Sequence, residues 1–147
     1  MRAFDVNVLV YAHRADSPHH DACRRFVEGE TTGPSLFGVP ALALSGFLRV
    51  TTHPRVFTTP SSLRDALDFV EALTARANCM IMHPGPRHWG VFVDLLLQSH
   101  GRGNLVPDAY LAAMAIETGS DWVTTDRGFA RFPGLRTVDP RNNPRSS

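Results

Sequence analysis

Lysine is absent from this chain of 147 residues, so all fifteen of its basic residues are arginine. This absence excludes enzymes that form a Schiff base on a lysine, and nucleotide-binding proteins that hold phosphate with a P-loop lysine. With 14 acidic residues, the formal net charge is only +1. Such a charge argues against a generally basic nucleic-acid-binding protein. It allows a local arginine patch, and arginine suits bidentate phosphate contacts.

Cysteines and long apolar segments are also scarce. Cys23 and Cys79 form no CxxC pattern, and two cysteines do not make a disulfide framework. We expect both to be reduced, in a protein of the cytoplasm. No apolar run approaches the roughly 20 residues that span a bilayer, and the N-terminus lacks the features of a signal peptide. We therefore expect no membrane association.

The spacing of apolar residues alternates between strand and helix patterns. Strands are expected over residues 2–6, 79–82, 122–125 and 136–138, and helices over residues 7–13, 17–30, 36–52, 60–74, 87–99 and 108–118. Strands that alternate with helices predict an α/β fold, in which a parallel sheet is covered on both faces. We expect one domain over residues 1–139 and a flexible tail over residues 140–147, which is rich in Pro, Asn, Arg and Ser.

Two of these helices carry more detailed expectations. Ser17 followed by Pro18 is typical of a helix start, with Ser as the cap and Pro in the first turn. In the helix over residues 87–99, the pattern predicts four inward-facing side chains, those of Trp89, Val93, Leu96 and Leu97.

Three aspartates lie at the edges of apolar elements. Asp5 follows the first strand, Asp108 begins an Ala-rich helix, and Asp126 ends a short β-branched segment. In a parallel α/β domain the carboxyl ends of the strands meet at one edge, where ligands bind. Three carboxylates there would repel one another unless a cation neutralised them, and hard oxygen ligands suit Mg²⁺ or Mn²⁺. We therefore predict Asp5, Asp108 and Asp126 as the catalytic and metal-binding residues of a site for phosphate chemistry.

Each aspartate also has a structural interpretation. Asp5 could cap the helix after it, Asp126 could cap the turn near Phe129, and the helix dipole favours Asp108 in a first turn. Function is favoured most at Asp5, because a carboxylate in a buried strand is costly unless it is compensated. Glu117 lies about 13 Å from Asp108 along the helix axis, so we expect it to serve packing or helix ends rather than the same metal ion.

Several arginines follow Asp126 closely: Arg127, Arg131, Arg136, Arg141 and Arg145. The simpler interpretation is a solvated arginine-rich end of the chain. The functional one is a rim beside the acidic edge that binds phosphates. Arg127 is the best candidate to face a substrate, whereas Arg131 could anchor the turn near Phe129.

Four segments together resemble one known family. Residues 5–12, 47–57, 103–113 and 124–135 resemble the PIN-domain family, specifically the VapC-type ribonuclease toxins of bacterial toxin–antitoxin modules. The resemblance implies a three-layer α/β/α PIN-like domain with a central, mostly parallel sheet. It implies a Mg²⁺- or Mn²⁺-dependent endoribonuclease that cuts structured RNA (tRNA or rRNA) to inhibit translation, a cognate VapB-like antitoxin and a homodimer. By the same resemblance, Asn7 and Thr125 would position the acidic site.

The chain departs from the family pattern in two places. Residues 42–46 contain no acid where relatives usually carry a glutamate, and Gly128 replaces an aspartate of many relatives. Weak metal binding without RNA is therefore expected, and a catalytically weak or inactive PIN-like RNA- or protein-binding module is the alternative. A phosphatase of the haloacid-dehalogenase type is disfavoured, because it needs a second aspartate where this chain has Asn7 and normally uses a lysine.

Overall fold

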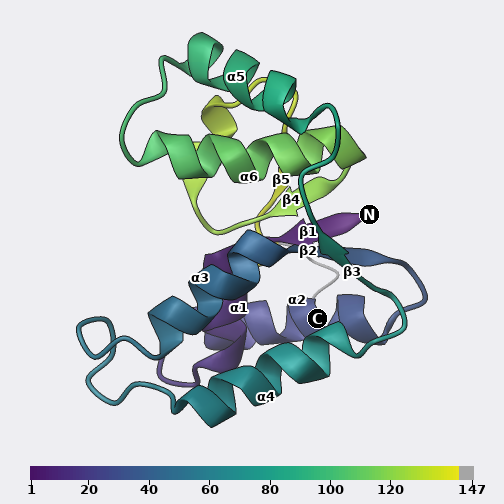
Figure 1. Ribbon diagram of the computed structural model, residues 1–147. Coiled ribbons are helices and arrows are strands. Elements are labelled where there is room, and N and C mark those ends of the chain that lie inside the picture. The colour runs from purple at the N-terminus through teal and green to yellow at the C-terminus, as the bar shows by residue number, and fades with distance from the viewer. Residues whose placement is uncertain (143–147) are drawn as a thin grey trace.

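A parallel sheet forms the centre of the protein, in a computed structural model that describes residues 1–142 (Figure 1). Within these residues, the sheet has five strands in the order β3-β2-β1-β4-β5, and every neighbouring pair is parallel. The strands are β1 (Arg2–Phe4), β2 (Phe37–Pro40), β3 (Cys79–Met82), β4 (Asp121–Val123) and β5 (Arg136–Val138). The predicted, mostly parallel sheet is confirmed.

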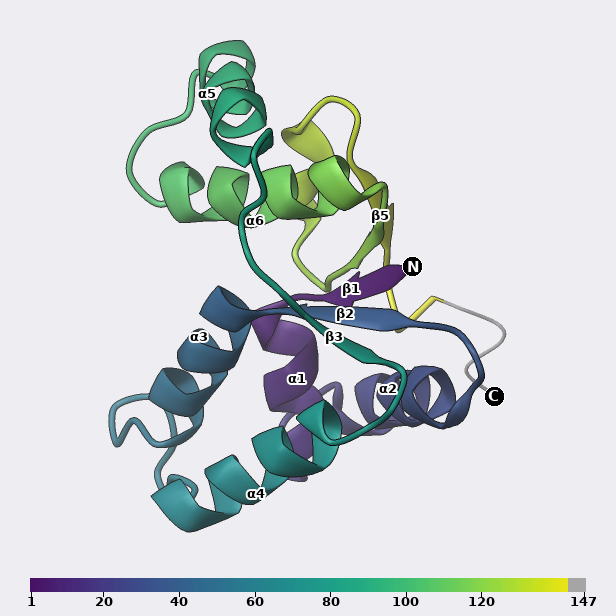
Figure 2. The same cartoon turned by 45° about the vertical axis from the view of Figure 1, so that its right-hand side comes forward.

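Helices cover both faces of this sheet (Figures 1 and 2). One face packs against α1 (Val6–His13), α2 (His20–Thr32), α3 (Ala41–Thr51) and α4 (Leu63–Thr74). The other packs against α5 (His88–Ser99), α6 (Leu105–Thr118) and the 3₁₀ helix η1 (Arg127–Arg131). An apolar core lies on each face of the sheet, and successive strand residues point to opposite faces. Phe4 and Val123 lie in the first core, and Ala3 and Trp122 lie in the second. The three-layer α/β/α architecture is therefore confirmed.

The segment predicted as one buried helix over residues 36–52 was assigned wrongly in its first part. It begins with the fully buried strand β2, and α3 starts only at Ala41. A short, wholly apolar run has no periodicity that separates a buried strand from a buried helix. Gly38 allows close packing in this strand, since a Cβ there would lie 2.5 Å from the sulfur of Met82 on the neighbouring strand. Pro40 ends β2 and lies immediately before α3.

The predicted start of α2 at Ser17 and Pro18 was also wrong, since the helix begins at His20. The Ser17 hydroxyl donates instead to the backbone oxygens of Arg14, at 2.6 Å, and Tyr11, at 3.3 Å. It therefore satisfies carbonyls at the end of α1 rather than capping α2.

The predicted inward face of α5 was wrong in part. Trp89 and Leu97 are 67% and 70% exposed, whereas Phe92 and Leu95 are buried together with His88. The reason is the neighbour of α5: the Nε2 of His88 lies 2.8 Å from the backbone oxygen of Tyr110 on α6. This contact turns the face that carries His88 and Phe92 toward α6.

The last described residues pack against the domain. Pro140 is buried, and the Arg141 guanidinium bonds to both carboxylate oxygens of Asp139 and to the Thr125 backbone oxygen. A flexible tail from residue 140 stays a prediction, and residues 143–147, including Arg145, lie outside the described part. Within residues 1–142, no helix is both long and apolar enough to cross a bilayer.

Candidate active site

The candidate site lies where the chain leaves two neighbouring strands in opposite directions. After β1, Asp5 leads into α1 on one face of the sheet, and after β4, Thr124 to Asp126 lead into η1 on the other. Because β1 and β4 are adjacent, this is a topological switch point, where the crevice beyond the strand ends is the usual ligand site of an open α/β sheet.

Asp5 is held at this edge by three hydrogen bonds. Its backbone N–H donates to the Val123 oxygen at 3.0 Å, which continues the β1–β4 pairing. Its Oδ1 accepts from the Val6 N–H at 2.7 Å, and its Oδ2 accepts from the Thr124 hydroxyl at 2.7 Å. The interpretation of Asp5 as a helix cap is therefore confirmed, but the cap alone does not explain a carboxylate that is only 5% exposed.

The pKa of Asp5 is raised, because its surroundings do not fully compensate the charge of the ionised carboxylate. Burial raises the pKa from 3.8 to about 6, even though the hydrogen bonds from Thr124 and Val6 oppose the rise. The charges of Asp108 and Asp126 raise it further. A carboxyl group in this state gains most from a nearby cation, which would favour its ionised form.

Asp108 and Asp126 approach the same place from other elements. Asp108 lies in the first turn of α6, and burial, then the charge of Asp126, raises its pKa, while Arg131 opposes the shift. Asp126 precedes η1, and its Oδ1 accepts from the Gly128 N–H at 2.8 Å, so its predicted capping role is confirmed. The fold thus brings the three predicted site residues together, and each of them also occupies the start of a helix.

A single cavity of about 860 Å³ contains all three aspartates. Five residues of α3 form part of its wall: Leu42, Ser45, Gly46, Arg49 and Val50. The loop after α3 adds Val56 and Phe57. The cavity is large enough for a nucleotide unit beside the acidic edge.

Arg14 fixes the loop that forms part of this cavity. Its guanidinium lies over the Phe57 ring, 4.2 Å from the centroid, and donates to the Thr59 oxygen at 2.6 Å and the Ser61 hydroxyl at 3.1 Å. It also pairs with Asp16, another residue of the cavity lining. Arg14 thereby neutralises this fourth acid, whereas the three predicted aspartates form no ion pair within residues 1–142.

The residues fit a magnesium ion that keeps much of its own water. Among the described residues, no three histidine, cysteine, aspartate or glutamate side chains form a cluster that could hold a metal ion by themselves. Mg²⁺ does not require such a cage, because it is commonly bound by one or two carboxylates, several waters and substrate phosphates. The donors available here are carboxylate oxygens, which are the hard ligands that Mg²⁺ and Mn²⁺ prefer. Which aspartates contact the ion stays a prediction.

Thr124 is the positioning residue that sequence reasoning missed. It is buried, donates to Asp5, and accepts a hydrogen bond from the Asp126 N–H at 3.0 Å, so one hydroxyl links two of the aspartates. The sequence signal was a hydroxyl residue at the end of an apolar strand. Asn7, which was expected to position the site, accepts from the Thr125 N–H at 3.4 Å.

Glu117, Arg131 and Arg136 make contacts that stabilise helix ends and strands. Glu117 accepts from the backbone N–H groups of Gly85 and Arg87, each at 2.9 Å, which confirms its role at a helix end. Arg131 donates to the Gly128 oxygen at 3.0 Å, so it does anchor the η1 turn. The placement of Arg136 beside the acidic edge was wrong: it begins β5, at the opposite edge, and pairs with Asp121. The edge of the sheet at which a residue lies depends on whether it begins or ends its strand, and closeness to Asp126 in the sequence does not determine it.

The two departures from the family pattern have local structural counterparts. On α3, the cavity wall is formed by Leu42, Ser45 and Gly46, and a Cβ at Gly46 would lie 3.1 Å from a methyl of Val6. At Gly128, a Cβ would lie 3.0 Å from Asp126 Oδ1, so a side chain there would disturb the cap.

Comparisons with known proteins agree with this geometry. A model of the PIN domain matches residues 3–135. Ribonuclease VapC43 of Mycobacterium tuberculosis is 46% identical over 140 residues, which cover 95% of each protein. Ribonuclease VapC25 of the same organism is 41% identical over 140 residues, covering 95% of this chain and 99% of that protein.

Solved structures share the fold at lower identity. VapBC2 from Rickettsia felis, bound to a DNA fragment from its promoter, has a TM-score of 0.69 at 18% identity, covering 93% of this chain and 96% of that one. VapC20 of Mycobacterium tuberculosis, a sarcin-ricin loop cleaving toxin, has a TM-score of 0.67 at 14% identity, covering 92% and 99%. With the family model and these relatives covering most of its length, the chain belongs to the PIN-domain family, among the VapC ribonucleases.

Proposed function

We propose that this protein is the toxin of a type II toxin–antitoxin system, a divalent-metal-dependent endoribonuclease that cleaves structured RNA and so inhibits translation. The observation that carries the proposal is the convergence of Asp5, Asp108 and Asp126 on one cavity at the switch point of the sheet. The relatives named as VapC ribonucleases agree with it.

In this proposal the protein's side chains hold the metal ion and position the site for cleavage of a phosphodiester. A bound Mg²⁺ or Mn²⁺ would activate a water and stabilise charge on the scissile phosphate. Asp5 and Asp108 would hold the ion, and Asp126 would complete or orient the site. Thr124 fixes Asp5 and Asp126 relative to each other through its two hydrogen bonds, and Asn7 holds the backbone at Thr125.

The proposal is tested by cleavage of purified RNA with Mg²⁺, with Mn²⁺ and with EDTA. We expect cleavage with either metal, none with EDTA, and loss of at least a hundredfold in rate for Asp5→Asn, Asp108→Asn and Asp126→Asn. The matched control is Asp94→Asn, which makes the same chemical change on the exposed side of α5 and outside the cavity lining. If the metal-loaded wild type binds RNA but cleaves none, the alternative of a binding module replaces the nuclease.

A VapB-like antitoxin is the partner that this function requires, and we place both proteins in the cytoplasm, where translation occurs. Solved toxin–antitoxin complexes share the fold, among them a complex from Klebsiella pneumoniae. The acids and arginines around the cavity would allow an antitoxin Arg or carboxylate to occupy the site. We therefore expect antitoxin and RNA to compete. A complex that cleaves RNA at the full rate of the free toxin would contradict this mode of neutralisation.

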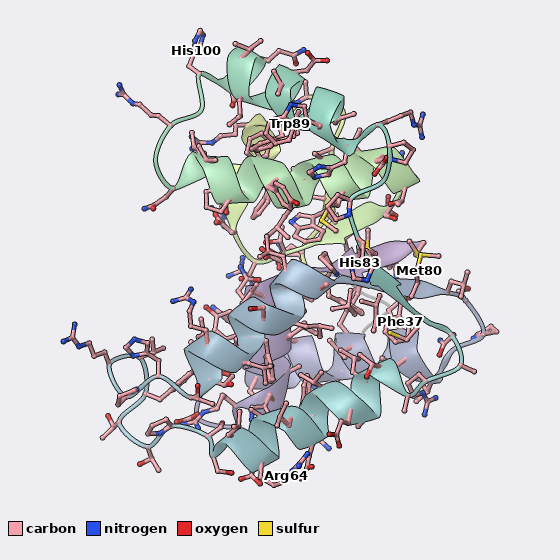
Figure 3. All side chains as sticks on the ribbon, in the orientation of Figure 1. Phe37, Arg64, Met80, His83, Trp89 and His100 are labelled. Atoms are coloured by element: carbon pink, nitrogen blue, oxygen red, sulfur yellow. The ribbon has the colours of Figure 1, made fainter. Side chains whose placement is uncertain are left out.

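A homodimer is a further part of the proposal. Large apolar side chains are exposed on the edge strand β3, with Met80 and Ile81, and on α5, with Trp89 and Leu97. Figure 3 labels Met80 and Trp89. Such surfaces are typical of association sites. Analytical ultracentrifugation of the purified protein tests the assembly, and a monomer at all concentrations would remove it.

A further inference from the structure

Arg49 is the basic residue of the acidic cavity. Among the residues that line this cavity in the described part of the chain, four are acidic, Asp5, Asp16, Asp108 and Asp126, and Arg49 alone is basic. Asp16 is already paired with Arg14. Within residues 1–142, Asp5, Asp108 and Asp126 form no ion pair, so a phosphate that enters the cavity meets three carboxylates without an ion-pair partner and one arginine.

The guanidinium of Arg49 is available for a ligand. Arg49 is exposed, and within residues 1–142 its side chain takes part in none of the hydrogen bonds or ion pairs, although arginines such as Arg14, Arg136 and Arg141 are all paired. Its distance from the aspartates exceeds that of an ion pair, which leaves space between cation and carboxylates for another group. A phosphate is the group whose charge suits both a metal ion on one side and an arginine on the other.

The position of Arg49 on α3 is equally informative. Leu42, Ser45 and Arg49 are spaced three and four residues apart, so they share the helix face that lines the cavity. This face contains no acid, and its charged group is a cation. Although α3 supplies no acidic side chain to the metal site, it contributes a positive charge to the same cavity.

We propose that Arg49 binds a backbone phosphate of the RNA within the catalytic cavity, opposite Asp5, Asp108 and Asp126. The inference rests on the proposed function and adds a substrate-binding residue to it. Arg49 compensates part of the repulsion between the phosphates and the three carboxylates. The contact with phosphate is bidentate, because the planar guanidinium matches two phosphate oxygens.

A purely structural role for Arg49 predicts a different result. Arg49 lies in the last turn of α3, where a positive charge also interacts favourably with the helix dipole. Its replacement would then lower the melting temperature and leave the affinity of the folded protein for RNA unchanged. Stability and RNA affinity must therefore be measured on the same variants.

The experiment uses a fluorescein-labelled RNA hairpin in EDTA, with binding followed by anisotropy at several salt concentrations. Without metal, cleavage does not contribute, so the result does not depend on catalysis. The variants are Arg49→Ala and Arg49→Lys, with Arg64→Ala as the matched control. Arg64 lies on α4 outside the cavity lining, on the side of the molecule away from α6 (Figure 3). Melting temperatures of all four proteins are recorded in the same buffer.

We expect Arg49→Ala to weaken RNA binding roughly tenfold and to reduce the salt dependence by about one charge-equivalent. Arg49→Lys should restore the salt dependence but only part of the affinity, because it keeps the charge without the bidentate geometry. Arg64→Ala should have the same RNA affinity and the same salt dependence as the wild type. Unchanged affinity and salt slope in Arg49→Ala would overturn the proposal, as would an equal loss in Arg64→Ala. Failure of the wild type to cleave RNA with metal would instead contradict the proposed function, while this binding result still stood.

Discussion

The Thr124 hydroxyl donates a hydrogen bond of 2.7 Å to Oδ2 of Asp5, across 119 residues of sequence. Both groups are buried, and each immediately follows one of two neighbouring strands, β1 and β4. The same hydroxyl oxygen accepts from the Asp126 N–H. One threonine therefore determines where two of the three candidate acids lie relative to each other.

Replacing Thr124 with valine should damage stability and site together. The variant keeps the side-chain shape but leaves Asp5 Oδ2 and the Asp126 N–H without this partner, which we expect to cost about 1–3 kcal/mol of unfolding free energy. The pKa of Asp5 should rise further, because the lost bond favours the ionised form. Urea denaturation measures the loss of stability, and Mg²⁺ titration measures the effect on the acidic site. Thr124→Ser, which retains the hydroxyl, is the control, and a valine variant as stable as the serine variant would refute the role of the bond.

The raised pKa of Asp5 predicts a specific dependence of stability on pH. Because the pKa is about 6 in the folded state against 3.8 as the ordinary value, the folded protein binds more protons between these pH values. Its stability should therefore fall as the pH rises from about 4 to about 6, by about 3 kcal/mol from this group. Asp5→Asn removes the titration, so in EDTA the variant should gain on the wild type across this window. A difference between the two proteins that does not change with pH would contradict the assignment.

Metal addition should reverse part of that loss. Mg²⁺ favours the ionised form of Asp5, so at pH 7 it should raise the melting temperature of the wild type and have a smaller effect on Asp5→Asn. An equal rise in both proteins would show that the ion binds elsewhere.

The sequence was sufficient for most of the architecture, because strands and helices with clear periodicity define a parallel sheet. It failed where periodicity carries no information. The strand β2 reads as a continuous apolar run, and its identity depends on pairing with β1 and β3, which lie far away in sequence. The amphipathic pattern placed Trp89 inside, yet the buried face of α5 is determined by the contacts of His88 and Phe92 with Tyr110.

The candidate site shows the same division. Asp5, Asp108 and Asp126 were selected from their positions at strand and helix ends, because a parallel sheet gathers those ends; their catalytic role stays a prediction. Thr124 and the proposed phosphate-binding residue Arg49 were not selected, since a buried hydroxyl or an exposed arginine has many ordinary explanations in a sequence. Only their neighbours, an acid at 2.7 Å and a cavity with three carboxylates, distinguish them.

An acid added to α3 should strengthen metal binding. Ser45 is exposed and lines the cavity on the helix that lacks a glutamate, so Ser45→Glu introduces a carboxylate without burying it. Because ligand charge tunes affinity, we expect about tenfold tighter Mg²⁺ binding in the absence of RNA, measured by titration calorimetry. Ser45→Gln has nearly the same size without the charge and should bind as the wild type does. Equal affinities for the Glu and Gln variants would show that the missing acid does not limit metal binding.

The last prediction compares two arginines that follow Asp126. Arg127 is exposed and directly adjoins Asp126, whereas Arg136 lies at the opposite edge of the sheet, where it pairs with Asp121 and donates to the Gly119 oxygen. Arg127→Ala should therefore weaken RNA binding and lower its salt dependence by roughly one charge-equivalent, while Arg136→Ala leaves both unchanged. Stability should respond in the other order, since within residues 1–142 the side chain of Arg136 forms hydrogen bonds and that of Arg127 forms none. Affinity measured at several salt concentrations, with a melting curve for each variant, tests both halves. If Arg136→Ala weakened RNA binding as much as Arg127→Ala, the RNA would not follow the carboxyl edge of the sheet.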